Sequence, residues 1–189
     1  MDATAIIEVL SRTVPPAGLE PVQAGDGMPT IYVTRDHLVE TCRALRDTPE
    51  LRFAFLVDLL PVDYLPREPR FEIVYLLASL GMSGFGDTAK RLRVKVRVPG
   101  HDVTVPSVSS VWPAANWSER EAYDLFGIHF SDHPDLRRIL MPDDWEGFPL
   151  RKDYPVQIKL PVKTYEPLQV SQEQFVASVE ATRKRARKE

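Results

Sequence analysis

The sequence has almost no cysteine. Cys42 is the one thiol among 189 residues, so no internal disulfide can form, which fits a reducing compartment. An iron–sulfur cluster usually takes four cysteine ligands from its protein, and this chain cannot supply them. The scarcity of thiols therefore argues against a disulfide-stabilised fold and predicts that the chain carries no cluster of its own.

Long apolar runs are also missing. The longest, near residues 53–62 and 73–80, are too short and too interrupted by charge or proline to cross a bilayer. The first ten residues do not have a basic segment followed by an apolar stretch and a cleavage site, so we expect no signal peptide. The sequence predicts a cytoplasmic protein whose association with a membrane depends on a partner.

A large excess of charge of one sign is absent as well. The chain has 24 Lys and Arg against 27 Asp and Glu, and its net charge of −3 predicts no bulk attraction to nucleic acid. The last seven positions are nevertheless crowded with Arg183, Lys184, Arg185, Arg187 and Lys188. This basic tail is short and lacks interleaved aromatic residues. We interpret it as a solvated helix end, where cations are favoured, rather than as a phosphate-binding site.

The hydrophobic pattern predicts an α+β fold with a mixed or antiparallel sheet and flanking helices over residues 1–127. Evenly spaced prolines then predict an extended partner-docking arm over residues 128–170, and a C-terminal amphipathic helix with a basic tail is expected over 171–189. Within the first region, we expect helices at 3–10, 35–46, 106–112 and 118–126, and strands at 19–23, 30–34, 52–60, 70–80 and 91–98.

Residues 91–98 alternate regularly between apolar and cationic side chains. Leu92, Val94, Val96 and Val98 would lie on one face, and the Arg and Lys residues between them on the other. Two interpretations stay open for the cationic face. It is either a docking surface for an acidic partner or the solvated face of an edge strand that resists aggregation.

Catalytic and ligand-binding motifs are sparse. His129 and His133 have HxxxH spacing, but Gly127 ends the preceding predicted helix, so the two rings are not expected to share a metal ion. The glycines between 81 and 86 lack the spacing of a phosphate-binding loop. Cys42 lies on an apolar helix stripe with no obvious base nearby. We therefore predict no catalytic, cofactor-binding or metal-binding residue.

Three carboxylates fall in one predicted helix: Glu119, Glu121 and Asp124. Only Glu121 and Asp124 have a spacing that places them on one face, and the sequence gives no sign of the cleft that acid–base catalysis requires. We interpret the three as favourable charges near the helix N-terminus. Ser118 and Glu121 are predicted to form a capping box, and Arg120 to pair with Asp124.

Three linked motifs carry a specific signal. They are ANWSEREAYDLFGI at 115–128, HPDLRRIL at 133–140 and WEGFPLRKDYP at 145–155. Together they resemble the signature of the C subunit family of NADH-quinone oxidoreductase (respiratory complex I). Two positions depart from the family pattern. Asp132 replaces a usual Gly and is expected to tolerate the same left-handed backbone, and Phe148 stands where His is common.

The resemblance implies a non-catalytic, peripheral-arm subunit of a proton-translocating NADH-quinone oxidoreductase. Family members pack next to subunits B, D and I and hold the quinone-reducing module together, while FMN and iron–sulfur clusters belong to other subunits. The chain would thus be part of an enzyme without an active site of its own. It would lie on the cytoplasmic side of the cell membrane, as a peripheral component of a membrane complex.

Partner docking is expected from aromatic and charged residues of the three motifs, because such residues are enriched in protein interfaces. The expected docking residues are Trp117, Glu119, Arg120, Glu121, Tyr123, Asp124, Phe126, His133, Asp135, Arg137, Arg138, Arg151, Lys152, Asp153 and Tyr154.

Three other functions remain open from the sequence. One is the equivalent subunit of a related membrane-bound hydrogenase or of a dehydrogenase with another electron donor. Another is a free-standing adaptor that binds protein or RNA. The third is an enzyme acting through Glu121 and Asp124.

Overall fold

The computed structural model describes residues 2–14, 18–80, 89–155 and 171–186, and the chain forms two units, Met1–Tyr154 and Pro155–Glu189. The second unit contains helix α4 (Gln172–Ala186), whose first turn is capped by Ser171. The Gln174 N–H donates to the Ser171 hydroxyl at 3.2 Å, and the Ser171 N–H donates to the Gln174 side chain at 3.1 Å. Most of the predicted arm, residues 156–170, lies outside the described residues.

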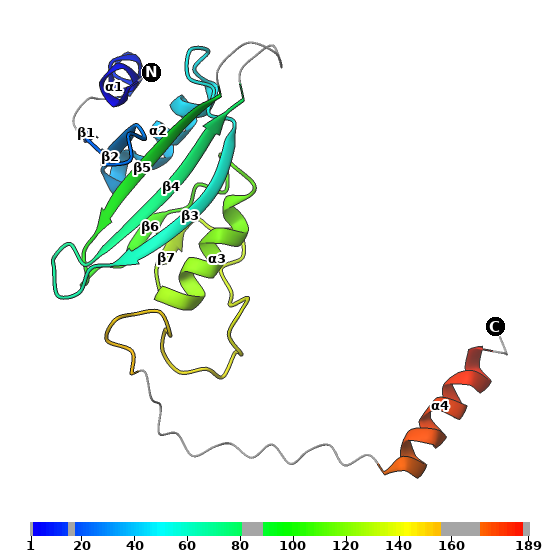
Figure 1. Ribbon diagram of the computed structural model, residues 1–189. Coiled ribbons are helices and arrows are strands. Elements are labelled where there is room, and N and C mark those ends of the chain that lie inside the picture. Colours follow the sequence, from blue (N-terminus) through cyan, green and yellow to red (C-terminus); the bar gives the residue numbers. More distant parts are fainter. Residues whose placement is uncertain (1, 15–17, 81–88, 156–170, 187–189) are drawn as a thin grey trace. The chain divides into compact units, whose positions relative to one another are not determined.

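The first unit is built on a five-stranded mixed sheet in the order β1-β2-β5-β4-β3 (Figure 1). Strands β3, β4 and β5 are antiparallel neighbours, β2 pairs with β5 in parallel, and β1 pairs with β2 in antiparallel. The predicted mixed α+β fold is confirmed. The strands are β1 (Leu19–Val22), β2 (Thr30–Val33), β3 (Phe55–Asp63), β4 (Phe71–Ser79) and β5 (Lys90–Val98).

Three α-helices, a 3-10 turn and a small second sheet complete this unit. The predicted helix at 106–112 is wrong, because residues 104–106 form a strand and turns follow it. No described helix is long and apolar enough to cross a membrane. The elements are α1 (Ala3–Leu10), η1 (Arg35–His37), α2 (Leu38–Asp47), α3 (Ala115–Phe126), β6 (Thr104–Pro106) and β7 (His129–Ser131), with β6 and β7 paired in parallel.

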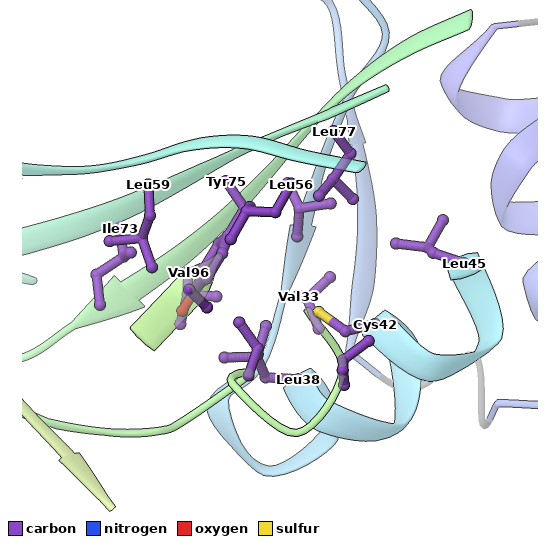
Figure 2. Packing of buried hydrophobic residues seen from close by; sticks show 14 of the residues in the cluster. Val33, Leu38, Cys42, Leu45, Leu56, Leu59, Ile73, Tyr75, Leu77 and Val96 are labelled. Carbon is purple, nitrogen blue, oxygen red and sulfur yellow. The ribbon is translucent and has the colours of Figure 1, made fainter. Parts of the chain in front are cut away.

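The core lies on one face of the sheet (Figure 2). Val94 and Val96 of β5 are fully buried there and belong to the same apolar cluster as Leu38, Cys42 and Leu45 of α2. Cys42 is thus the small buried apolar residue that its helix stripe predicts, and burial raises the pKa of its thiol well above the ordinary value. A buried thiol with a raised pKa packs like a small apolar side chain and does not act as a nucleophile.

Strand β5 lies in the interior of the sheet, between β2 and β4. The interpretation of residues 91–98 as an edge strand is therefore wrong. Its cationic face is also largely neutralised within the chain. Ion pairs join Arg93 to Asp26 at 2.6 Å, Lys95 to Glu72 at 2.8 Å and Arg97 to Glu20 at 3.1 Å.

The ends of α3 follow their local sequence only in part. Gly127 adopts a left-handed conformation (φ 69°) as the C-terminal cap, as the sequence predicts. The N-terminal prediction is wrong, because the helix begins at Ala115 and its cap position, Ala114, makes no side-chain cap. Ser118 is consequently inside the helix and has no capping role. The backbone N–H groups of Ala115 and Asn116 instead donate to the carbonyl oxygens of Trp112 and Pro113 in the preceding turn.

Candidate partner-docking site

Asp124 of α3 joins the helix to the segment that follows it. Its buried carboxylate accepts hydrogen bonds from the backbone N–H groups of Ile139 at 3.0 Å, Leu140 at 2.7 Å and Met141 at 2.8 Å. Arg138 donates to the other carboxylate oxygen at 3.1 Å. Burial alone raises the pKa of Asp124, but these hydrogen bonds outweigh it and lower the pKa below its ordinary value. Asp124 is therefore ionised and fixes residues 138–141 against α3.

Arg120, one turn before Asp124 in α3, binds the same segment. Its guanidinium donates to the carbonyl oxygens of Arg137 at 3.1 Å and Arg138 at 3.2 Å. The predicted pair between Arg120 and Asp124 is wrong, because Arg138 occupies the carboxylate that Arg120 would have used. The Arg120 guanidinium also lies 5.1 Å from the centre of the Trp117 ring, and most of that indole stays exposed.

Gly127 permits a close approach at the end of α3. A Cβ atom at this position would collide with the Phe148 ring and the Arg151 guanidinium. Arg151 donates to the carbonyl oxygens of Phe126 and Gly127 and stacks on Phe148 at 4.6 Å. The absence of a side chain at Gly127 thus lets residues 148–151 pack over the C-terminus of α3.

The two departures from the family motifs fit this arrangement. Asp132 has φ 61°, so it adopts the left-handed backbone expected at a position where the family usually has Gly. Phe148 packs edge-to-face on Tyr123, with ring centres 6.5 Å apart, and receives Arg151 on its face. The aromatic ring that replaces the common His therefore contributes packing rather than a titratable group.

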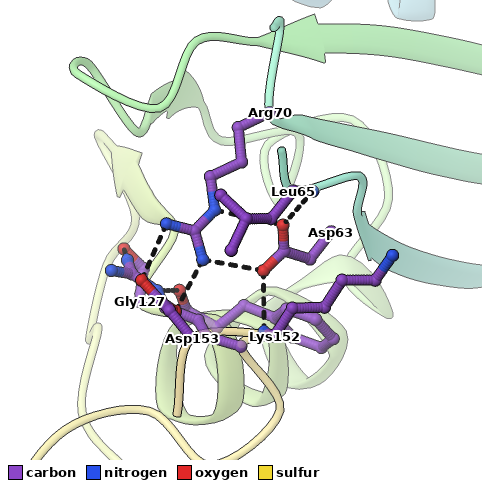
Figure 3. Close-up of polar contacts among 8 residues, drawn as sticks. Asp63, Leu65, Arg70, Gly127, Lys152 and Asp153 are labelled. Atoms are coloured by element: carbon purple, nitrogen blue, oxygen red, sulfur yellow. Dashed lines mark hydrogen bonds and ion pairs between the residues drawn. The ribbon is translucent and has the colours of Figure 1, made fainter. Parts of the chain in front are cut away.

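A second polar network anchors the end of the segment to the sheet (Figure 3). Arg70, just before β4, donates to Asp63 at 2.8 and 3.0 Å and to Asp153 at 2.7 and 3.0 Å. The backbone N–H groups of Lys152 and Leu65 donate to the same Asp63 carboxylate at 2.9 and 3.0 Å. Burial raises the pKa of Asp63, but these donors outweigh it and lower the pKa to about 2.

Sequence reasoning missed Asp63 and Arg70. Neither residue belongs to the three motifs, and Arg70 meets Asp153 across 83 positions of the chain. A local pattern cannot signal a pairing of that length. Because of the two networks, residues 128–154 belong to the first unit, which ends at Tyr154 rather than at the predicted boundary of residue 127.

Glu119 occupies a buried position on the other side of α3. Its carboxylate accepts from the Ser107 hydroxyl at 2.6 Å and from the Val108 N–H at 2.7 Å. The His133 ring nitrogen Nε2 lies 3.9 Å away, and the backbone oxygen of Asn116 is 3.1 Å from the same nitrogen. Burial raises the pKa of Glu119 to about 7, against the lowering effect of its two hydrogen bonds. The interpretation of Glu119 as a charge favoured by the helix dipole is therefore wrong.

The raised pKa predicts a pH-dependent stability. The folded chain binds this proton more tightly than the unfolded chain, so the free energy of unfolding falls as the pH rises from about 4.5 to above 7. A shift of this size corresponds to roughly 3 kcal/mol. Glu119→Gln keeps both hydrogen-bonding positions and cannot ionise, so this loss should disappear. Urea unfolding at pH 5.5 and 8.5 measures it, and parallel losses in wild type and variant would contradict the assignment.

The expected docking residues fall into two groups. One group makes contacts within the unit and includes Glu119, Arg120, Tyr123, Asp124, Phe126, His133, Arg138, Arg151, Asp153 and Tyr154, the last of which donates to the Glu146 carbonyl at 3.2 Å. The other group faces solvent, namely Trp117, Glu121, Asp135, Arg137 and Lys152. The first group, in which Asp153 is exposed but bonded to Arg70, fixes the segment on which Asp135, Arg137 and Lys152 lie.

Metal chemistry finds no support in this part of the molecule. His129 lies on β7 and His133 in the turn after it, so the two rings do not share a helix face. Among the described residues, no cluster of His, Cys, Asp and Glu is arranged to hold a metal ion. Buried charges and backbone hydrogen bonds instead hold residues 137–141 against α3 and residues 152–153 against the sheet.

Comparisons with known proteins agree on one family. The model of the family described as "Respiratory-chain NADH dehydrogenase, 30 Kd subunit" matches residues 31–159. The C subunit of NADH-quinone oxidoreductase from Roseiflexus sp. (strain RS-1) is 47% identical over 156 residues, which are 82% of this chain and 86% of the relative. The Geobacter sulfurreducens protein of the same name is 49% identical over 132 residues, 69% of this chain and 76% of the relative.

Two solved structures share the fold. A trypsin-resistant fragment (1-134) of Nqo5 is 35% identical, with a TM-score of 0.57, and the match covers 72% of this chain and all of that chain. A chain in the membrane-bound sulfane sulfur reductase, an archaeal respiratory membrane complex, is 23% identical with a TM-score of 0.64. The match covers 81% of this chain and 85% of that chain, and it shows a common fold.

Proposed function

The chain belongs to the respiratory-chain NADH dehydrogenase 30 Kd subunit family, whose members include the C subunits of NADH-quinone oxidoreductases, and we propose that it is a non-catalytic structural subunit of the complex's peripheral arm. In this role it packs next to subunits B, D and I on the cytoplasmic side of the membrane and holds the quinone-reducing module together. FMN and iron–sulfur clusters are carried by other subunits of the complex.

The observation that carries this proposal is the double anchoring of residues 133–154. Asp124 fixes residues 138–141 of the segment to α3, and Asp63 with Arg70 fixes Lys152 and Asp153 to the sheet. A surface that is ordered before binding loses less conformational entropy when a partner docks. The segment therefore supports a permanent interface, with Trp117 and Arg137 exposed at its surface.

A related alternative is the equivalent subunit of a membrane-bound complex with another electron donor. The likeness to the sulfane sulfur reductase chain supports it only at the level of fold. The Roseiflexus and Geobacter relatives at 47% and 49% identity are NADH-quinone oxidoreductase subunits, and they favour the NADH-linked complex.

Affinity purification of the tagged full-length chain from its native membranes tests the proposal. We expect subunits B and D to co-purify with iron–sulfur absorbance, and this absorbance should vanish when the chain is isolated. Trp117→Ala should lower the recovery of these partners at least tenfold, as expected of an interface hot spot worth about 2 kcal/mol. Arg43→Ala, at an exposed position of α2, is the matched control. Recovery of the wild-type chain without any redox subunit would contradict the function.

A further inference from the structure

Glu119 and His133 form a buried pair of titratable groups between α3 and the docking segment, residues 133–154. Both side chains are fully shielded from solvent, and Oε2 of Glu119 lies 3.9 Å from Nε2 of His133. This separation is too long for a hydrogen bond, so the two groups are close without being bonded. Glu119 comes from α3, whereas His133 lies in the turn after β7. The pair therefore connects the helix to the start of the docking segment.

Hydrogen bonds fix the position of the proton on the His133 ring. The backbone N–H of Asp135 donates to Nδ1 at 3.0 Å. Because a backbone N–H can only donate, Nδ1 carries no proton. The proton of the neutral ring is then on Nε2, where the carbonyl oxygen of Asn116 accepts it at 3.1 Å. An imidazolium would place a second donor against the Asp135 N–H, so the described turn requires a neutral His133.

The hydroxyl groups around Glu119 can accommodate the acid with or without its proton. Ser107 donates to Oε2 of the ionised acid at 2.6 Å. Its hydroxyl also lies 2.7 Å from that of Ser109, and either of the two could be the donor. When the acid keeps its proton, Oε2 can donate to Ser107 while Ser107 donates to Ser109. The same atoms thus satisfy both forms, and the partly exposed Ser109 connects them to solvent.

An ionised Glu119 has no fixed positive charge beside it in the described part of the chain. His133 is the only basic side chain there that forms an ion-pair contact with this carboxyl. Arg120, the next residue on α3, is bonded to carbonyl oxygens of the docking segment. Cys42 of α2 and Tyr75 of β4 also face Glu119, but burial raises the pKa of each well above its ordinary value. Both stay neutral near pH 7, so ionisation leaves a buried carboxylate without a counter-charge.

Loss of the Glu119 proton changes the balance of hydrogen bonds at His133. A carboxylate is a stronger acceptor than a carbonyl oxygen, so it would draw the Nε2–H away from Asn116. The imidazole ring is rigid, and its Nδ1 would then turn away from the Asp135 N–H. The change would release the first turn of the docking segment, whereas the attachment of residues 138–141 to Asp124 would remain.

We propose that Glu119 and His133 act as a proton switch for docking, which holds the turn at residues 133–135 while the carboxyl carries a proton and loosens this turn when the proton is lost. The raised pKa of Glu119, about 7, places the change near neutral pH. A loosened turn must be reordered when a partner docks, so binding should weaken on the alkaline side. This inference rests on the proposed function, since it concerns regulation of the same docking surface.

Hydrogen exchange of the Asp135 amide in the isolated full chain tests the switch. Its protection factor, which corrects for the intrinsic pH dependence of exchange, should fall by about fivefold or more between pH 6.5 and pH 8.5. The Lys152 amide is the matched control on the same segment, because it is bonded to Asp63, whose pKa of about 2 lies far below this range. The protection of Lys152 should stay constant.

Two substitutions separate the switch from a general effect of pH on stability. Glu119→Gln resembles the protonated acid, so the protection of the Asp135 amide should be equal at both pH values. His133→Asn keeps an acceptor for the Asp135 N–H but has no Nε2–H for the carboxylate to attract. In this variant the free energy of unfolding should still fall with rising pH, whereas the protection of Asp135 should not. An equal loss of protection in wild type and both variants would overturn the proposal.

Recovery of the redox subunits from native membranes at the same two pH values measures the effect on docking. Wild type should recover about threefold less, or lower still, at pH 8.5, and Glu119→Gln should recover equal amounts at both. If wild type recovers no redox subunit at either pH, the proposed function fails, while exchange in the isolated chain still decides whether the switch exists. Equal recovery by wild type at both pH values leaves the function standing and overturns the regulation.

A measurement on wild type alone applies if either variant fails to fold. Nitrogen-15 NMR of the full chain with labelled histidine reports which nitrogen of the His133 ring carries the proton. Nδ1 should be unprotonated at pH 6.5, and the ring signals should shift with the same midpoint as the carboxyl carbon of Glu119. A proton on Nδ1 at pH 6.5, or ring signals that do not follow the Glu119 titration, would refute the switch.

Discussion

Asp124→Ala is expected to lower the free energy of unfolding by about 3–5 kcal/mol, because the change leaves the partly buried Arg138 without its carboxylate and three backbone donors without their acceptor. The wild-type carboxylate serves Ile139, Leu140 and Met141 through one oxygen and Arg138 through the other. Urea unfolding of the purified chain at neutral pH measures the loss. Limited proteolysis should show faster cleavage between residues 137 and 150, since the segment loses its attachment to α3.

The matched control is Asp135→Ala. Asp135 also pairs with an arginine, Arg137 at 2.9 Å, but both side chains are more than half exposed. Exposed ion pairs contribute about 0–1 kcal/mol, so this variant should unfold close to wild type. Equal effects of the two substitutions would show that the burial of Asp124 and its backbone donors do not matter.

Arg70→Ala is expected to have an effect of similar size at the other end of the segment. The substitution leaves the carboxylate of Asp63, whose side chain is 2% exposed, without its main counter-charge and also releases Asp153. Removing one partner of a buried ion pair costs about 3–5 kcal/mol. Arg12→Ala, which removes an exposed pair with Glu50 at 3.8 Å, serves as the control and should cost less than about 1 kcal/mol.

The dependence of the free energy of unfolding on pH below about pH 4 distinguishes the loss of the Asp63–Arg70 ion pair from a general loss of packing. The pKa of Asp63 is about 2 in the folded chain against an ordinary value of 3.8. Its contribution to stability is therefore complete above pH 3.8 and is lost as the pH falls through about 2. Arg70→Ala removes the hydrogen bonds and the positive charge that Arg70 contributes to lowering the pKa of Asp63, so this pKa should rise and the variant should lose less stability than wild type between pH 4 and pH 2. The same acid dependence in both proteins would rule out the ion pair as its source.

The sequence predicted the features that depend on neighbouring residues. The alternation in β5, the apolar stripe of α2 and the left-handed Gly127 each follow from a few adjacent positions, whereas the left-handed Asp132 is expected from the family resemblance. Local chemistry is sufficient in these cases, because a strand face, a helix face and a backbone turn are set by side-chain period and steric freedom.

The features that failed depend on distant segments. An edge strand is one of two interpretations that the sequence leaves open for residues 91–98, because their cationic face suits an edge, but β2 pairs beside β5 in parallel, and no local pattern signals that pairing. Similarly, Arg120 and Asp124 have suitable spacing for an ion pair with each other, but both side chains form hydrogen bonds with residues 137–141 instead. The three motifs identified the region of the site, whereas the Asp63–Arg70–Asp153 network depends on contacts that only the folded chain provides.

The parallel pairing of β2 with β5 also constrains the order in which a newly synthesised chain folds. Ile31 faces Val94 in the register, so β1 and β2 leave the ribosome well before their partner exists. The sequential strands β3, β4 and β5 are joined by nearest-neighbour antiparallel pairings, which close more quickly than distant ones. We therefore expect this meander to assemble first and to recruit the amino-terminal hairpin afterwards. Until then that hairpin is exposed during translation, as a segment for chaperones to protect.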